Sequence, residues 1–234
     1  MQISRTIKMM QFTKENNKGS TFYFYEYKNI VMGFTEIGSE IEDVGEYLRT
    51  DRIVQLEQVH GNTIHFSGNT NGRPDGDGII LNENSVLAVI RTADCVPLFF
   101  WSEDGREAGA IHVGWRGLHS GIGINLLNIM KERGINLKEL VFFTGPAIEG
   151  KCYTVQQDVV DKFKGFNFTD KIFEKTSEGY SMDVTYGIEL CLTEHGVPKE
   201  NINHSWICTF CDPRFPSYRH GDREKRIFNF IKIK

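Results

Sequence analysis

The sequence predicts a mixed α/β (α+β) fold that is rich in strands and forms a single domain over residues 1–234. Three observations support this. Short apolar or alternating segments typical of strands occur along most of the chain, and segments with helical periodicity lie between them. The two kinds do not follow the strict β-α-β order of a doubly wound parallel sheet. No Pro- or Ser-rich linker divides the chain, which indicates one domain.

The first strands are predicted from an aromatic alternation. Thr21–Tyr27 alternates aromatic residues with others, and Ile30–Phe34 is the expected hairpin partner. Further apolar runs predict strands at Arg52–Val59, Val86–Thr92, Pro97–Trp101, Glu107–Val113, Leu140–Thr144, Asn203–Thr209 and Arg226–Lys232. The Gly-, Asn- and Asp-rich stretch 67–78 is expected to be a loop inside the domain.

Two longer helices are predicted from their apolar faces and end signals. Leu118–Arg133 carries apolar residues at helical spacing and ends at a glycine. Asp183 can cap a helix over Val184–His195, and Gly196 can end it. Shorter helices are expected at Glu40–Leu48 and Gln156–Phe163.

Composition excludes several classes of protein. The net charge of −4 and a pI near 6.0 give no basic footprint for nucleic acid. The longest apolar runs fall far short of the roughly 20 residues of a membrane-spanning helix. Met1–Ser20 has charges throughout and is not expected to be a signal peptide. Five scattered cysteines do not indicate a disulfide framework, so we expect a cytoplasmic protein. Oligomeric state is not indicated.

Three short segments place polar chemistry at the ends of apolar strands. They are QVHG, RTADC and HVGWRG, and they contain His60, Cys95 and His112. If the three ends converge, they present imidazole, thiolate and imidazole. Three nitrogen and sulfur ligands with an open fourth position are typical of catalytic zinc sites. Asp75 and Asp77 then become candidates to hydrogen-bond a ligating histidine, or they are turn formers.

The residues alone leave this interpretation open. The separations between the three segments match no short zinc-binding motif. Cys95 can instead be a small buried core residue. Glycines crowd the predicted helix entry after His112, and Arg116 in this turn can bind a phosphate or carboxylate, or form a surface ion pair. Arg219 is a second candidate for an anionic group and Tyr218 for stacking on a ring, unless this stretch is a solvated turn.

The remaining cysteines offer a second constellation. Cys208 and Cys211 form a CxxC with His204 upstream and His220 downstream, which suggests a second zinc site, a redox pair or a structural strand end. We favour the structural role, because a single CxxC is a weak signal. Cys152 lies in a predicted loop where its thiol can line a pocket. A further cysteine, in the second long helix, is expected in the core.

Taken in order, five motifs resemble the YfiH family of laccase-domain proteins, now described as purine nucleoside phosphorylases. They are QVHG, TADC, HVGWRG, GPAI with CYTV, and CT followed by FPSYRHGD, and the resemblance covers about residues 52–231. It implies an α/β fold with a β-rich layered core, similar to the catalytic domain of cytotoxic necrotizing factor. It also implies a metal triad at His60, Cys95 and His112, with zinc as the expected metal and copper under the older polyphenol-oxidase label.

The resemblance further implies an activity and a substrate site. Family activities are phosphorolysis of adenosine, inosine, guanosine and S-methyl-5'-thioadenosine, and deamination of adenosine. The expected partners are therefore a small purine nucleoside and phosphate. Arg116 and Arg219 are the candidates for a phosphate clamp, and Asp94 is the carboxylate nearest the triad. The rings expected to stack on a purine belong to Trp115, Phe99 and Tyr218.

This chain departs from the family pattern in two places. The N-terminal loop before Glu40–Leu48 is shorter than in many members, which affects the expected nucleoside preference. The family's Ser-Tyr-Arg-Arg is Ser-Tyr-Arg-His here, so one cation is lost at His220.

Three alternative functions stay open. A cysteine hydrolase would use Cys95 as nucleophile and His112 as base. A copper-dependent phenol oxidase is the second, although seven histidines are few for a multicopper enzyme. The third is a binding protein with a closed structural zinc, for which His65 is the nearest additional ligand in the sequence.

Overall fold

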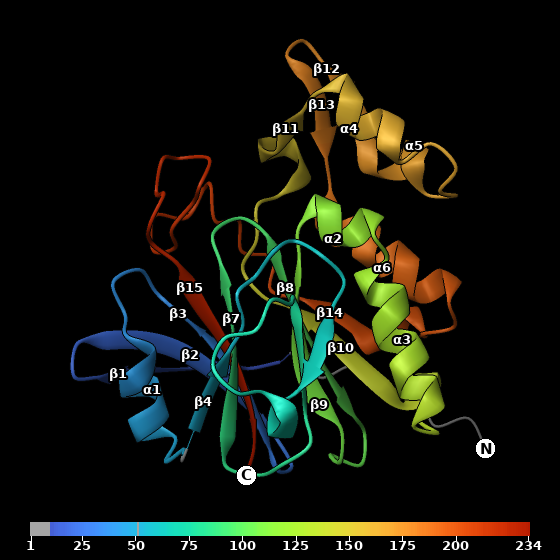
Figure 1. The fold of residues 1–234 in the computed structure, drawn as a ribbon. Helices are drawn as coiled ribbons and strands as arrows, with labels where there is room; N and C mark the ends of the chain where they lie inside the picture. The colour runs from blue at the N-terminus through green and yellow to red at the C-terminus, as the bar shows by residue number, and fades with distance from the viewer. Residues whose placement is uncertain (1–9, 51) are drawn as a thin grey trace.

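The computed structural model describes residues 10–50 and 52–234, and Figure 1 shows it as a ribbon. The mixed α/β architecture predicted from the sequence is confirmed: two six-stranded sheets pack face to face, with helices on their outer faces. Residues 1–9, part of the N-terminal stretch that is not expected to be a signal peptide, lie outside the described residues. Within the described residues, no helix is both long enough and apolar enough to cross a membrane.

The first sheet collects strands from both ends and the middle of the chain. Its strands, in spatial order, are β1 (Thr13–Asn17), β2 (Ser20–Tyr27), β3 (Ile30–Thr35), β15 (Ile227–Ile233), β7 (Val86–Thr92) and β4 (Arg52–Gln55). All neighbours are antiparallel except β4 and β7, which are parallel. The final strand β15 lies between β3 and β7, so the C-terminal segment holds the middle of this sheet together.

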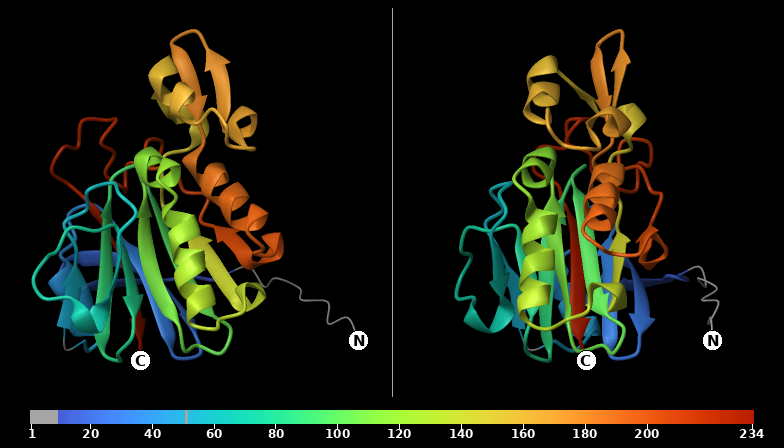
Figure 2. Two further views of the ribbon diagram at one scale, coloured as in Figure 1. Left: turned by 45° about the vertical axis from the view of Figure 1, so that its right-hand side comes forward. Right: turned by 90° about the vertical axis from the view of Figure 1, so that its right-hand side faces the viewer.

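The second sheet is built from the middle of the chain. Its strands, in spatial order, are β14 (Ile202–His204), β10 (Leu140–Thr144), β8 (Val96–Ser102), β9 (Ala108–Val113), β6 (Gly78–Leu81) and β5 (Ile64–Phe66). A small third sheet contains β11 (Thr154–Val155), β13 (Gly179–Met182) and β12 (Phe173–Thr176). It stands with α4 (Gln157–Lys162) and α5 (Thr169–Ile172) beyond one end of the two large sheets (Figures 1 and 2).

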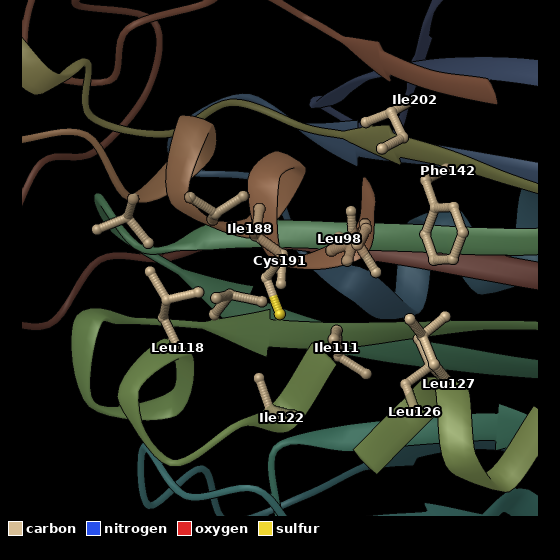
Figure 3. Packing of buried hydrophobic residues seen from close by; sticks show 14 of the residues in the cluster. Leu98, Ile111, Leu118, Ile122, Leu126, Leu127, Phe142, Ile188, Cys191 and Ile202 are labelled. Atoms are coloured by element: carbon tan, nitrogen blue, oxygen red, sulfur yellow. The ribbon is translucent and has the colours of Figure 1, made fainter. Parts of the chain in front are cut away.

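Alternating side chains on each strand bury both faces of the second sheet. On β8, Leu98 and Phe100 pack toward helices, whereas Phe99 and Trp101 pack between the two large sheets. Figure 3 shows the helical side of this core, where helix and strand residues interdigitate. The helices on that side are α2 (Trp115–His119), α3 (Ile122–Glu132) and α6 (Val184–Glu194). On the opposite side, α1 (Ile41–Tyr47) covers the first sheet.

Several predicted elements differ in the structure. The single helix expected over Leu118–Arg133 is two helices, α2 and α3, because Gly121 takes a left-handed conformation (φ +80°) between them. The strand expected over Asn203–Thr209 ends at His204, and Trp206 has a positive φ that is incompatible with a continuing strand. Strands β1, β6, β11, β12 and β13 were not predicted.

Candidate metal centre

The three predicted ligand residues converge where the chain passes from one large sheet to the other. His60 lies in the connection from β4 to β5, and Cys95 lies between β7 and β8. His112 is the penultimate residue of β9. One ligand atom from each side chain lies within 4.8 Å of the others, so the expected convergence of strand ends is present. A site at strand ends is held rigidly and opens to space beyond the sheets.

Asp77 organises two of these residues at once. Its Oδ1 lies 2.8 Å from His112 Nδ1, which leaves Nε2 of that ring for a ligand. The same carboxylate accepts the backbone amides of His60 (3.0 Å) and Gly61 (2.6 Å). Asp77 is fully buried and reaches the site directly before β6. The structure therefore gives the supporting position to Asp77, whereas Asp75 meets His65 through its backbone carbonyl.

Electrostatics at the centre favour an ionised thiol. Burial alone raises the pKa of Cys95, but His112 and His60 outweigh it and bring the pKa to about 6. Burial lowers the pKa of His112, whereas Cys95 and Asp77 raise it to about 9. Burial raises the pKa of Asp77, and hydrogen bonds from His112 and the Gly61 and His60 amides hold it below its usual range. Both shifts favour a thiolate beside an imidazolium in the centre without a metal.

The backbone around the centre is shaped for the ligand atoms. His60 and Asp94 have positive φ values of 58° and 88°, which are costly for residues with a Cβ and are typical of functional sites. A Cβ at Gly114 would lie 2.9 Å from His60 Nδ1 and 3.1 Å from Cys95 Sγ. Glycine at this position therefore leaves the space that two ligand atoms occupy.

The donor set fits a borderline-soft metal ion. Two imidazoles and one thiolate are ligands that Zn²⁺ prefers, and a hydrogen-bonded carboxylate behind one imidazole is typical of such sites. His65 does not join this group among the described residues, and its Nε2 lies 2.9 Å from the Asp75 carbonyl. The fourth protein ligand expected for a closed structural zinc is thus absent from the described part of the chain.

A cavity of about 600 Å³ lies over the centre. It is bounded by the sheet ends, by the turn that leads into α2, by the C-terminal segment before β15 and by the segment entering the small sheet. Four arginines share its wall: Arg91, Arg116, Arg219 and Arg226. A cavity of this size with several convergent cations suits a small anionic ligand.

The predicted substrate residues reach this cavity with one exception. Arg116, Arg219, Tyr218 and Asp94 all line it, as does the stacking candidate Trp115. Arg116 lies over the Trp115 ring at 4.4 Å. The stacking predicted for Phe99 is wrong, because that ring is fully buried between the large sheets, where alternation along β8 places it.

Asp94 has both of its carboxylate oxygens engaged by the chain. Oδ1 accepts from Thr209 Oγ1 at 2.7 Å, and Oδ2 accepts from the Arg219 amide at 2.9 Å. Arg219 in turn donates from its guanidinium to the Thr154 carbonyl (2.8 Å) and lies over the Tyr153 ring. Asp94 therefore links the turn before Cys95 to Arg219 in the C-terminal segment.

Sequence reasoning missed four charged or aromatic residues of the cavity wall: Glu57, Arg91, Tyr153 and Arg226. Arg91 Nε is buried without a hydrogen-bond partner among the described residues, and its guanidinium lies 3.8 Å from Glu57. Gln58 holds the Arg91 backbone through two hydrogen bonds of 2.8 Å. Glu57 directly precedes the QVHG motif, Arg91 begins RTADC and Tyr153 lies in CYTV. Their positions in or beside these motifs could have identified them from the sequence.

Comparisons with known proteins agree with this architecture. Residues 37–234 match the family described as multi-copper polyphenol oxidoreductase laccase. A Rickettsia prowazekii protein named purine nucleoside phosphorylase RP494 is 31% identical over 224 residues, which cover 94% of this chain and 91% of that protein. Purine nucleoside phosphorylase YlmD of Bacillus subtilis is 33% identical over 163 residues, covering 68% of this chain and 59% of that protein.

Two solved structures share the fold over nearly their whole length. YlmD from Geobacillus stearothermophilus superposes with a TM-score of 0.81 at 28% identity and covers 96% of this chain and 99% of that one. YfiH from Bacillus licheniformis gives a TM-score of 0.82 at 26% identity and covers 91% of this chain and 96% of that one. The chain therefore belongs to the YfiH family of laccase-domain proteins, as its five motifs predicted.

Proposed function

We propose that this protein is a metal-dependent purine nucleoside phosphorylase. The observation that carries the proposal is one cavity of about 600 Å³ that contains both the His60, Cys95 and His112 group and four arginines. The names of its relatives, including that of the Rickettsia prowazekii protein, point to the same reaction. The proposed substrates are adenosine, inosine, guanosine and S-methyl-5'-thioadenosine, with phosphate as co-substrate.

The proposed metal is Zn²⁺, held by His60, Cys95 and His112. Asp77 would fix the His112 ring and keep Nδ1 protonated, so that Nε2 faces the ion. When bound, the ion would supply Lewis-acid chemistry at an oxygen of substrate or water. Copper is the alternative metal. The described residues contain two groups that could hold a metal ion, and only one of them includes histidine, which favours zinc at the His60, Cys95 and His112 centre over a multicopper cluster.

Phosphate would bind to the arginine wall. Arg116 and Arg219 are the clamp residues predicted from the motifs, and Arg91 adds a guanidinium with a buried Nε that lacks a partner among the described residues. A charged donor without a partner is costly unless a ligand supplies the acceptor. Asp94 would serve substrate binding by holding the Arg219 backbone in place.

The purine would lie against the aromatic part of the cavity. Trp115, Tyr153 and Tyr218 line the cavity, and an arginine lies over each ring at 4.4, 4.5 and 4.2 Å. Tyr218 is the most exposed of the three, so its ring is the one we propose to stack on the base. Stacking of this kind tolerates different purines, in keeping with several nucleoside substrates.

In the proposed phosphorolysis, a phosphate oxygen forms a bond to the ribose anomeric carbon and the bond from that carbon to the purine nitrogen breaks. The purine leaves with the bonding electrons and takes up a proton, so the products are free base and ribose 1-phosphate. The arginines would place phosphate and balance its charge during this transfer. For deamination of adenosine, water replaces the amino group and ammonia leaves. Glu57, in the same wall, is the carboxylate we propose to carry the proton.

The test is a product analysis with purified, zinc-loaded protein. Adenosine and phosphate should give adenine, ribose 1-phosphate and inosine, and chelation of the metal should abolish all three. If folded, zinc-loaded protein forms none of them from any of the four nucleosides, the proposal fails. Arg91→Met should raise the KM for phosphate and leave the KM for nucleoside nearly unchanged. Arg106→Met is the matched control, because Arg106 pairs with Asp104 at a different pocket.

A second candidate function rests on the same residues. Asp77, His112 and Cys95 are arranged as orienting carboxylate, base and nucleophile, and the lowered pKa of Cys95 suits a cysteine hydrolase. Metal content separates the two candidates. A stoichiometric zinc that is lost in Cys95→Ala supports the metal enzyme, whereas metal-free protein that forms a covalent acyl adduct at Cys95 supports the hydrolase.

We propose that the enzyme works in a reducing cytoplasm. All five cysteines are free thiols, and the function requires that Cys95 stay reduced.

A further inference from the structure

A second group of sulfur atoms lies outside the proposed catalytic centre. Cys152 ends the 3₁₀ turn η3 (Gly150–Cys152), and Cys208 and Cys211 lie in the connection that follows β14. Their Sγ atoms all lie within 4.8 Å of one another, and those of Cys152 and Cys211 are 3.5 Å apart. The CxxC motif and a cysteine that precedes it by more than fifty positions are thus brought together by the fold.

The backbone positions the group as a rigid unit. Cys208 forms a bridge with Ala147, and the amides of Cys211 and Asp212 donate to the Cys208 carbonyl at 3.2 and 2.9 Å. The Glu149 amide donates to Cys208 Sγ at 3.4 Å. Amides that donate to sulfur favour a thiolate, which is the form that binds metal.

Packing alone does not explain this arrangement. Cys191, the core cysteine predicted for α6, is 3% exposed and contacts apolar side chains. By contrast, Cys211 is exposed and Cys152 is half-buried, so neither contributes a packed core side chain. Three thiols that meet where Cys211 reaches the surface, with the buried sulfur of Cys208 held by the Glu149 amide, match the ligand set of a soft or borderline metal ion.

We propose that Cys152, Cys208 and Cys211 form a second metal site that binds Zn²⁺ through three thiolates. On binding, each thiol gives its proton to solvent and its sulfur to the ion, and the exposed side of Cys211 leaves the fourth position to water. Neither histidine near the CxxC takes part. His204 hydrogen-bonds Thr144 and Glu189, and His220 packs on the Phe210 ring.

The site would brace the wall of the proposed catalytic cavity. Thr209, between the two CxxC cysteines, donates from its amide to the Ala147 carbonyl at 3.1 Å and from its hydroxyl to Asp94 at 2.7 Å. Asp94 directly precedes the proposed ligand Cys95. A metal held at Cys208 and Cys211 would therefore fix the segment that positions Asp94, without contacting substrate.

The first test is a Zn²⁺ titration of reduced, metal-stripped full-length protein. We expect two equivalents per chain in the native sequence. The double variant Cys152→Ser/Cys211→Ser should bind one, and the matched control Cys191→Ala should bind two. Titration with Co²⁺ reports on the ligands, because three thiolates give stronger sulfur-to-cobalt absorption than one. We expect the double variant to lose most of this absorption. Cys95→Ala should lose only the smaller part that comes from the first centre.

The second test uses the native sequence and so does not depend on the folding of a variant. Alkylation of Cys211, followed by peptide mass spectrometry, should slow on the order of tenfold when Zn²⁺ is added, and a chelator should restore it. A single zinc equivalent, unchanged alkylation of Cys211 with Zn²⁺, or a Cys152–Cys211 disulfide that persists in reductant would each overturn the proposal.

Discussion

The two sulfur-containing groups of this chain have opposite surroundings. At His60, Cys95 and His112, imidazoles and a buried carboxylate set the charge, the residues lie at the ends of a rigid double sheet, and the group opens into a cavity of about 600 Å³. At Cys152, Cys208 and Cys211, backbone amides provide the support, the residues lie on loops, and the group opens to solvent. Donor set and location together are the basis of our proposal that the first group is catalytic and the second braces the fold.

The sharpest test of this contrast removes one sulfur from each group. Cys95→Ala should abolish one zinc equivalent and lower phosphorolysis by roughly 10³-fold, since a catalytic metal is worth several kcal/mol to the transition state. Cys211→Ser should remove the other equivalent and leave most of the activity. Metal analysis and product assays on the same preparations measure both effects. Equal losses of activity in the two variants would contradict the division of roles.

The next largest effect is expected from the carboxylate behind His112. Asp77→Asn keeps the size of the side chain but removes the charge that orients the ring and the loop amides. Zinc affinity at the first centre should fall about 10–100-fold. Competition with a calibrated chelator measures this change, and the second equivalent should be unaffected. Asp75→Asn is the matched control, because Asp75 meets His65 through its backbone only, and it should bind zinc normally.

The comparison also separates what sequence could predict from what it could not. The convergence of the three proposed ligands could be predicted because each follows or ends an apolar strand, and strand ends of a layered fold meet. The strands themselves were predicted from alternation and apolar runs. Cys152 was not assigned to the CxxC, because its partners follow after more than fifty residues and an intervening small sheet.

The misses have specific physical causes. Gly121 was read as part of a helix entry, yet its positive φ divides that helix in two. β1 is polar and largely exposed at a sheet edge, so it carries no hydrophobic alternation to detect. Phe99 was expected to stack on a purine, but the alternation of β8 places its ring between the two large sheets. Arg91 was overlooked because its role depends on burial and a missing partner, which only the tertiary structure shows.

The third prediction, of intermediate size, concerns the pH at which the Cys95 thiol ionises. Its pKa of about 6 means that, in metal-free protein, the thiolate is present above pH 6 and is lost as the pH falls below it. Alkylation of Cys95, followed by peptide mass spectrometry, should therefore rise with a midpoint near pH 6, whereas Cys191 should need a much higher pH because burial raises its pKa to about 11. In Asp77→Asn the His112 cation is weakened, so the Cys95 midpoint should move upward. A midpoint near the ordinary thiol value of about 8.5 would contradict the described pairing with His112.

The smallest expected effect lies in the link between the two groups. Thr209→Val removes the hydroxyl that donates to Asp94 and keeps the shape of the side chain. A hydrogen bond to a charged group contributes about 1.5–3 kcal/mol, so the melting temperature should fall. The proposed first zinc centre should weaken only a few-fold, because Thr209 reaches it only indirectly, through Asp94 and Cys95. Calorimetry and chelator competition measure the two. If Zn²⁺ at the second group braces this segment, adding Zn²⁺ to metal-stripped protein should raise the melting temperature of the native sequence. The same addition should raise the melting temperature of Thr209→Val by a smaller amount. An equal rise in melting temperature in both proteins would mean that the stabilisation by Zn²⁺ does not depend on the Thr209 hydroxyl.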